Sequence, residues 1–240
     1  MSNKENAGMK AGHLHTESTD LFEEMGKSLR KEARRWPALL ALIIIGGAYA
    51  ILSDRLTIGP SWILIPLMAL LIIPAIITRL KGNHHVNHYL LLALCCLVTL
   101  AEITSISLLL ATLPDKSVAP VSLLRDAALL WTSNIIVFAL WYWQVDGGGP
   151  YERSHESCND YRQNADLLFP QLTLTEARPA FKEWRPGFMD YLFVAFNTST
   201  AFSPTDTPVL STSVKVLSMV QAALSLVTLA ALAARAINIL

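Results

Sequence analysis

Long runs without charge limit the folds open to this chain more than any other feature of its sequence. Charge-free stretches cover residues 36–53, 56–78 and 82–101, and the last of them continues past Glu102 to residue 114. A bilayer core about 30 Å thick is crossed by a helix of about 20 predominantly apolar residues. The pattern therefore predicts an all-α, polytopic helical membrane protein held in a lipid bilayer.

Charged side chains are gathered into a few blocks. The chain holds 19 basic and 19 acidic residues; 13 of these charges lie in residues 1–35 and 13 more in residues 146–190. Pro120 is expected to begin the fourth helix, and the glycines at 147–149 to end it. About five to six transmembrane helices are predicted, in four parts: a cytoplasmic arm with a short amphipathic helix (1–35), a four-helix transmembrane region (36–145), a polar loop or small cap (146–188) and a hairpin with a final transmembrane helix (189–240).

Basic residues beside the apolar runs predict the orientation. Residues 27–35 and the turn that carries Arg79 and Lys81 are rich in the side chains that favour the cytoplasmic face. The N-terminus is therefore expected in the cytoplasm, and four crossings return residues 146–190 to that side. Residues 191–205 are either re-entrant or a fifth full crossing. We favour the crossing, and six spans in all, because an even total places the C-terminus in the cytoplasm too.

Composition and motifs exclude several classes of function. The net charge is zero and the basic stretch is confined to the N-terminal arm, so nucleic acid is not an expected partner. The sequence shows no nucleophile elbow, phosphate-binding glycine loop, zinc-protease motif or pair of catalytic carboxylates. Neither enzymatic activity nor a cofactor is therefore expected.

Polar residues at the ends of the apolar runs have simple interpretations. His84, His85 and His88 lack a neighbouring acid or thiolate, so they are interpreted as a polar flank and not as a metal site. Arg125 and Asp126 are expected at the membrane edge, where long side chains extend toward water.

Glu102 is the most informative side chain of the apolar region. It lies near the middle of the third run, where an ionised carboxylate is costly unless it is paired, hydrated or protonated. At a rise of about 1.5 Å per residue, the matching depth in an antiparallel fourth helix falls at residues 132–134. Thr132, Ser133 and Asn134 are therefore predicted to form a buried polar cluster with Glu102. The cluster serves either interhelical hydrogen bonding or an ion or proton pathway.

A second polar stretch lies in the C-terminal hairpin. Residues 191–205 are weakly apolar and carry Asn197, Thr198, Ser199 and Thr200 in a row. This run is too short and too polar to face lipid as an ordinary span, so protein or water must line it. The helix that follows, residues 211–240, is rich in small side chains that allow close helix packing.

The stretch from Asn197 to Asp206, followed by a small-residue helix, resembles the pore helix, filter and inner helix of potassium-channel-type pore loops. The resemblance covers about fifty residues. Aligned on Thr198, Thr200 and Asp206, it implies that the filter positions are held by Ala201, Phe202, Ser203, Pro204 and Thr205. The family's two filter glycines and its tyrosine are replaced, and a proline lacks a backbone donor, so potassium selectivity is not predicted.

The resemblance implies an ion-channel-like homo-oligomer, a tetramer in that family, with residues 197–206 lining the pore. Side-chain hydroxyls and Asp206 would then favour monovalent cations weakly. The whole chain also resembles a family of uncharacterised bacterial inner-membrane proteins, which implies an inner-membrane location. The alternative is a non-conducting membrane module that keeps the hairpin for assembly and presents its polar loop to a partner.

Overall fold

The computed structural model describes residues 36–113, 119–155, 157–174, 177–200 and 206–237. The chain divides into two compact units, Met1–Leu39 and Leu40–Leu240, and the second contains the helical bundle. Within the described ranges the α-helices are α2 (Trp36–Ile51), α3 (Leu64–Leu80), α4 (His84–Thr112), α5 (Pro120–Val145), α6 (Glu152–His155), α7 (Cys158–Asn164), α8 (Pro170–Thr173), α9 (Phe188–Thr200) and α10 (Thr212–Ile237).

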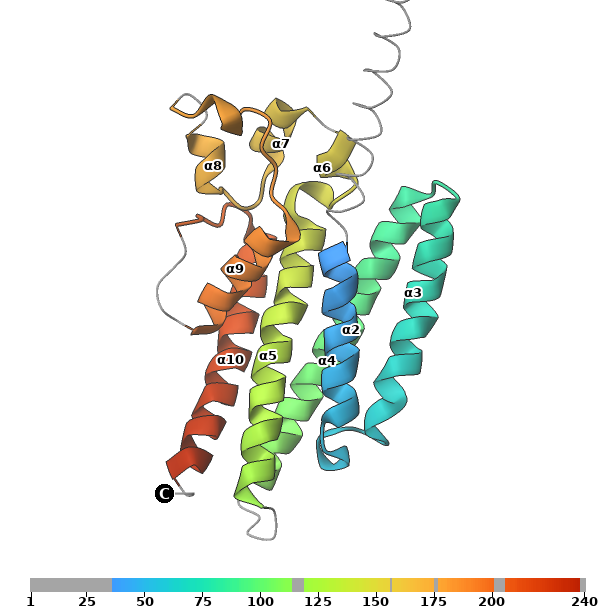
Figure 1. Ribbon diagram of the computed structural model, residues 1–240, viewed down its shortest axis with the longest axis vertical. Coiled ribbons are helices and arrows are strands. Elements are labelled where there is room, and N and C mark those ends of the chain that lie inside the picture. Colours follow the sequence, from blue (N-terminus) through green and yellow to red (C-terminus); the bar gives the residue numbers. More distant parts are fainter. Residues whose placement is uncertain (1–35, 114–118, 156, 175–176, 201–205, 238–240) are drawn as a thin grey trace, which may run out of the picture. The chain divides into compact units, whose positions relative to one another are not determined.

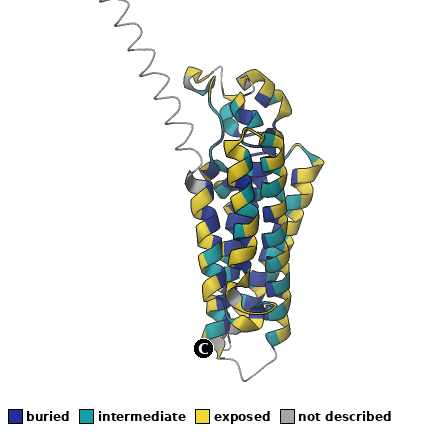
Figure 2. Ribbon diagram, turned by 90° about the vertical axis from the view of Figure 1, so that its right-hand side faces the viewer, coloured by how far each residue is buried: buried dark blue, intermediate teal, exposed yellow. Residues whose placement is uncertain are grey.

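From Leu40 onward, the long helices run alternately up and down the bundle (Figure 1). α5 begins at Pro120, as the sequence predicts. Proline is favourable at the first helical position because the backbone N–H that it lacks would have no partner within the helix there. α5 packs against α4, α9 and α10 and is the central helix of this unit. Residues 133–140 of α5 are all buried, so polar side chains in this stretch face protein and not lipid. Figure 2 shows the buried residues in dark blue on the inner sides of the helices and the exposed ones in yellow on the outer sides.

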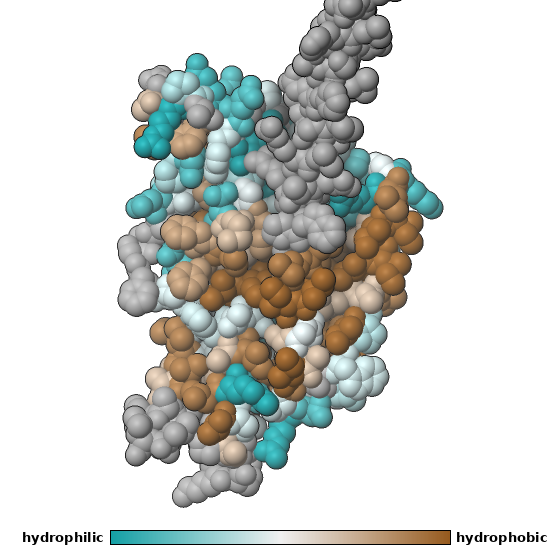
Figure 3. Space-filling view, in the orientation of Figure 1, coloured by the Kyte–Doolittle hydropathy of each residue, from teal (hydrophilic) through white to brown (hydrophobic). Residues whose placement is uncertain are grey.

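Apolar helices indicate a membrane protein and confirm that part of the prediction. Among the described residues, three helical stretches are long and apolar enough to cross a bilayer: His84–Thr112, Val121–Gly148 and Thr212–Ala234. Ala38–Ile51 and Leu64–Leu80 are shorter apolar helices. Apolar side chains, brown in Figure 3, gather over the helices of the bundle, whereas polar side chains cover the loop region at its upper end.

Residues 146–155, 157–174 and 177–187 form a small cap at one end of the bundle (Figure 1). α5 ends where Gly147, Gly148 and Gly149 adopt φ angles of 52°, 72° and 100°, which glycine reaches at little cost. A Cβ atom at Gly147 would lie 2.9 Å from the ring of Tyr161, so glycine is also required for space. The glycine turn therefore ends the helix as expected and sends the chain back over the bundle.

α9 covers most of the run for which we favoured a full crossing, and that crossing stays a prediction. It has 13 residues, so it spans about 20 Å at 1.5 Å per residue. Its first turn meets the cap, because the Tyr191 hydroxyl donates to the Asp146 carboxylate at 2.5 Å. The chain then returns to the same cap, where Leu167 and Val209 form an antiparallel bridge. α9 and the described residues after it, 206–210, therefore both meet the cap, and together they are called the hairpin below.

Two backbone hydrogen bonds fix this return. The Leu168 amide donates to the Pro208 carbonyl at 3.0 Å, and the Leu210 amide donates to the Asp166 carbonyl at 2.8 Å. These bonds satisfy backbone groups of the segment between α9 and α10 and hold it against the cap. The described end of α10 lies at the opposite end of the bundle (Figure 1).

Candidate functional site

Glu102 is fully buried, with 0% of its surface exposed, where α2, α4 and α5 meet. Its carboxylate lies beside the side-chain amide of Asn134, and the Tyr49 hydroxyl lies near both Glu102 and the Ser105 hydroxyl. However, four buried polar atoms here lack a partner at hydrogen-bond geometry, namely both oxygens of Glu102, the Tyr49 hydroxyl and Asn134 Nδ2. Unsatisfied polar atoms are costly in apolar surroundings, so their convergence marks a candidate site.

A chain of hydrogen bonds connects this cluster to α9 in the hairpin. The Ser199 hydroxyl on α9 donates to Asn134 Oδ1 at 3.0 Å. Gln221 on α10 donates from Nε2 to the Ser199 hydroxyl at 2.9 Å and to the Ala195 carbonyl at 2.7 Å. The Tyr142 hydroxyl completes the chain by donating to Gln221 Oε1 at 2.5 Å. Side chains from α5, α9 and α10 thus form one continuous buried network.

A second pair of hydrogen bonds joins α9 to α10 and α5. The Ser225 hydroxyl donates to the Ser199 carbonyl at 2.7 Å, and Trp131 Nε1 donates to the Ser225 hydroxyl at 3.1 Å. The Ser199 carbonyl lies in the last turn of α9, where backbone oxygens have no partner within the helix. Ser225 supplies that partner from α10 and so fixes the depth at which α9 ends.

Asp146 is the centre of the cap. Its carboxylate, with 0% of the residue exposed, accepts four hydrogen bonds. Two come from the hydroxyls of Tyr161 and Tyr191, at 2.8 Å and 2.5 Å, and two from the backbone amides of Asp166 and Leu167, at 2.8 Å and 3.1 Å. One side chain therefore joins the end of α5 to α7, to the backbone of Asp166 and Leu167 after α7, and to the first turn of α9.

Arg153 balances this carboxylate and caps α5. Its guanidinium donates to the backbone carbonyls of Asp146 and, at 2.8 Å, of Trp143, which lie at the C-terminal end of the helix. The guanidinium carbon also lies 5.1 Å from the centre of the Tyr191 ring. A cation at a helix C-terminus is favourable because the helix dipole is negative there. Arg153 therefore stabilises the same junction from the opposite side.

We expect the cap to loosen in alkali. Burial, and then the adjacent Asp146 carboxylate, raise the pKa of Tyr161 above its ordinary value of 10.0. A group whose pKa is raised by folding contributes stability that is complete below its unfolded pKa and is lost as the pH rises through the folded one. The protection of the Leu167 amide, which is the intrinsic exchange rate divided by the observed rate at the same pH, should therefore fall only well above pH 10. A Tyr161→Phe variant should lack this step, and an unchanged alkaline profile in that variant would assign the step to another group.

The hairpin residues predicted from the sequence fall into three groups. Asn197, Thr198 and Thr200 bond back to carbonyls of their own helix, at 2.9 to 3.1 Å for the shortest contact of each. Ser199 is instead buried and points at Asn134. Asp206, the first residue described after position 200, is exposed. The filter positions 201–205 lie outside the described residues.

The cluster predicted around Glu102 is only partly assembled. Ser133 and Asn134 are buried, and Asn134 faces Glu102 as the depth argument predicts. Thr132 is exposed and donates to the Ala128 carbonyl at 2.9 Å, so its inclusion in the cluster is wrong. Successive residues of a helix point about 100° apart, so three consecutive residues cannot all face one neighbour.

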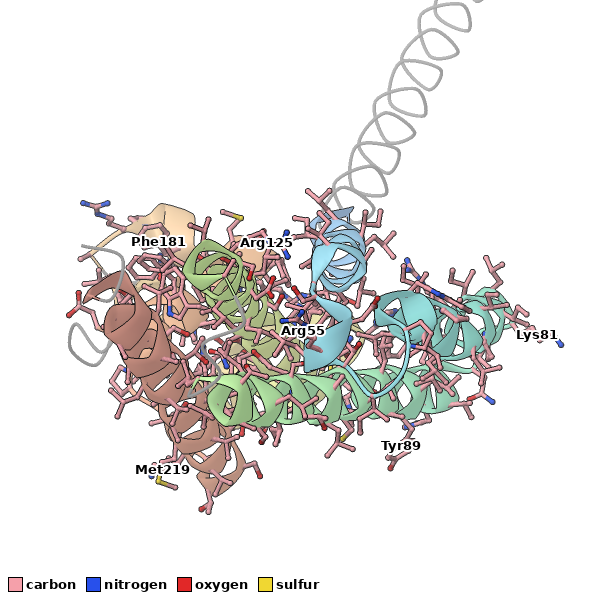
Figure 4. All side chains as sticks on the ribbon, turned by 90° about the horizontal axis from the view of Figure 1, so that it is seen from below. Arg55, Lys81, Tyr89, Arg125, Phe181 and Met219 are labelled. Carbon is pink, nitrogen blue, oxygen red and sulfur yellow. The ribbon has the colours of Figure 1, made fainter. Side chains whose placement is uncertain are left out.

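Asp126 also departs from its predicted place. Only 1% of the residue is exposed, and its carboxylate accepts from the Ser53 hydroxyl at 2.5 Å and from the Arg125 guanidinium at 2.8 Å. Arg125 extends outward as expected, with half of its side chain exposed. Asp126 and Arg55 line a pocket of about 390 Å³ at the end of the bundle opposite the cap (Figure 4). The partner that buries Asp126 comes from the loop after α2, which sequence reasoning did not place.

The histidines of α4 face the cap. The His84 ring stacks on Tyr151 with ring centres 3.6 Å apart, and both residues line a pocket of about 210 Å³ that also includes His88 and Glu152. In the described part of the chain, no group of three or more His, Cys, Asp or Glu side chains is placed to hold a metal ion. These histidines form the contact between the start of α4 and the start of the cap.

Sequence reasoning missed two central residues. Gln221 has 0% of its surface exposed, and an amide in the apolar middle of the last helix was a signal in itself, because polar side chains inside the membrane usually have a partner. Asp146 carried no such signal, since it is one of eight acidic residues in the polar segment 146–190. Only the fold shows that its carboxylate is buried.

Comparisons with known proteins identify no relative. No protein-family model, curated protein or solved structure matches the chain. The fold itself defines an all-helical protein with helices long and apolar enough to cross a membrane.

Proposed function

We propose that the chain is one subunit of an ion-channel-like oligomer of the bacterial inner membrane, with the re-entrant hairpin at its pore. The observation that carries the proposal is the placement of residues 188–200 and 206–210, which both meet the cap. A half-length helix descends from the cap, the chain returns to the cap, and a full-length helix follows. This order of elements agrees with the pore-loop resemblance of the sequence.

The outer face of α9 supports assembly with further copies. Phe193, Phe196, Asn197 and Thr200 share one face by their spacing, and both phenylalanines are exposed. An amide and a hydroxyl at membrane depth are unfavourable against lipid, whereas a neighbouring copy or a water-filled path would accept them. The exposed side chains Met219 and Leu226 on α10 offer further apolar contact area. A tetramer is proposed by resemblance alone.

The chemistry of the hairpin favours weak cation preference. Asp206 is exposed at the return of the chain, and a ring of such carboxylates would attract monovalent cations without the backbone geometry of a potassium filter. Pro204 and the absence of glycine in residues 197–206 argue against potassium selectivity.

Planar-bilayer recording of the purified full chain tests conduction. We expect single-channel currents whose reversal potential in a salt gradient shows a preference for cations. An Asp206→Asn variant should keep the currents and lose most of that preference, while Asp160→Asn, which alters an exposed cap carboxylate, should behave as wild type. Silent bilayers across varied pH and voltage, with protein shown to be inserted, would exclude the channel.

Cysteine labelling tests the orientation. Arg79 and Lys81 lie at the cap end of the bundle, so the cap and the mouth of the hairpin are proposed to be cytoplasmic. An Asp206→Cys variant without the three native cysteines should react with an impermeant maleimide only after the cells are opened. Labelling of intact cells would reverse the orientation and place the hairpin on the side that potassium-channel pore loops use.

The alternative is a non-conducting module that presents the cap to a cytoplasmic partner. The observation that favours it is the internal order of the cap, which is built around the buried Asp146 and not left as a polar loop. Crosslinking in native membranes separates the two proposals. Crosslinks between copies support the pore, whereas cap crosslinks to other proteins, without links between copies, support the module.

A further inference from the structure

Glu102 lies on α4, outside the hairpin, and its complete burial needs an explanation of its own. The carboxyl is fully enclosed and neither oxygen has a partner at hydrogen-bond geometry. An isolated ionised carboxylate in such surroundings costs several kcal/mol. A positive charge must therefore accompany it, either as a bound cation or as a proton on the carboxyl itself.

The direction of the hydrogen-bond chain shows which atom of Asn134 faces Glu102. The Ala195 backbone carbonyl can only accept, so the side-chain nitrogen of Gln221 must point at it. That nitrogen also donates to the Ser199 hydroxyl, which leaves the hydroxyl hydrogen of Ser199 for Asn134 Oδ1. Asn134 therefore turns Nδ2 away from Ser199 and toward Glu102. A backbone carbonyl on α9 thus orients an amide on α5.

The surroundings of Glu102 provide few oxygen ligands. Asn134 presents a donor, so the hydroxyls of Tyr49 and Ser105 are the neighbouring side-chain oxygens identified around the carboxyl. Ca²⁺ and Mg²⁺ take about six or more oxygen ligands, which is more than this group supplies. A proton needs only one carboxyl oxygen and a single hydrogen-bond acceptor beside it, such as either hydroxyl.

Charged groups do not approach Glu102 from the described parts of the neighbouring helices. α2 contributes Tyr49, which is the titratable neighbour, and α5 contributes Asn134. α3 buries only apolar side chains, and α9 and α10 reach the cluster through the neutral amides and hydroxyls of the chain. Asp126 and Arg125 lie eight and nine residues before Asn134, about 12 Å along α5.

We infer that Glu102 is an exchangeable proton-binding site. In the protonated form its carbonyl oxygen accepts from Asn134 Nδ2, and its O–H donates to the hydroxyl of Tyr49 or Ser105. Release of the proton leaves a carboxylate that still accepts from Asn134, so the same donor chain serves both forms. The site is independent of conduction through the hairpin, and its binding partner is a proton from water.

Infrared difference spectroscopy of the full chain in lipid nanodiscs tests this inference. We expect a carbonyl band of a protonated carboxyl that disappears reversibly as the pH is raised and that is absent from Glu102→Gln. The matched control is Asp126→Asn, which removes the other buried intramembrane carboxyl and should keep the band. Loss of the band in the control but not in Glu102→Gln would overturn the assignment, as would a band that never titrates while the protein stays folded.

Two further measurements keep the test independent of how Glu102→Gln folds. Ser199→Ala and Asn134→Leu retain Glu102 but remove the oriented donor, so the carboxyl band should move to higher frequency because its carbonyl loses a hydrogen bond. An unchanged frequency in both variants would contradict the oriented chain. Sodium added at constant pH should leave the band unaltered; its disappearance would replace the proton by a metal cation.

Discussion

Replacing Asp146 with alanine is expected to release the cap from the bundle. The substitution removes the acceptor of four hydrogen bonds, and the donors that remain are two tyrosine hydroxyls and two backbone amides in a closed space. A buried donor left without a partner costs about 1–3 kcal/mol. We therefore expect the cap to lose at least about 4 kcal/mol of local stability. Asp146→Asn should have a smaller effect, because its amide oxygen still accepts.

Hydrogen exchange and limited proteolysis measure this release. Protection at the Leu167 amide and at the first turn of α9 should fall together, because Asp146 bonds both to Leu167 and to Tyr191. Asp160→Ala is the matched control, since Asp160 is an exposed acid of the same cap that bonds only locally to Ser157. If both alanine variants resist protease equally, Asp146 is not the residue that holds the cap.

The fold could be predicted from the sequence where the signal is local. Charge-free runs predicted the apolar helices, and Pro120 and the glycine turn predicted the ends of α5, because each rests on hydropathy or backbone geometry within a few residues. The pairing of Glu102 with Asn134 was also predictable, since helix rise converts sequence distance into depth. The error on Thr132 arose because depth was used without the angular position around the helix.

Features that depend on distant contacts were not predictable in this way. The length of α9 agrees with either a short crossing or a re-entrant helix. The sequence did not predict the contacts with the cap, which are the bridge between Leu167 and Val209 and the bond of Tyr191 to Asp146. Neither contact leaves a periodic pattern in the sequence. Asp126 is similar, because its burial depends on Ser53, which lies 73 residues away.

Replacing Gln221 with leucine is expected to free α9 from α10. The side chain of Gln221 donates to the Ala195 carbonyl and to Ser199, and it accepts from Tyr142. Leucine fills a similar space but leaves the Ala195 carbonyl without its side-chain partner and removes the 2.5 Å bond of the Tyr142 hydroxyl, which keeps the longer contact of 3.2 Å with Ser218. Two weakened buried groups at about 1 kcal/mol or more each correspond to about 30-fold more frequent opening of α9.

A pair of further variants separates the hydrogen bonds of Gln221 from its volume. Gln221→Glu keeps the size and the acceptor for Tyr142 but has at most one donor, on a protonated carboxyl, in place of two, so it should loosen α9 in the same direction as leucine. Ser213→Leu places the same apolar side chain on an exposed position of α10 and should leave exchange in α9 unchanged. Exchange of the Ser199 amide in nanodiscs gives the measurement. Equal protection in wild type and both Gln221 variants would mean that packing alone holds the hairpin. It would also mean that the hydrogen bonds from Tyr142 through Gln221 and Ser199 do not fix the orientation of the Asn134 amide beside Glu102.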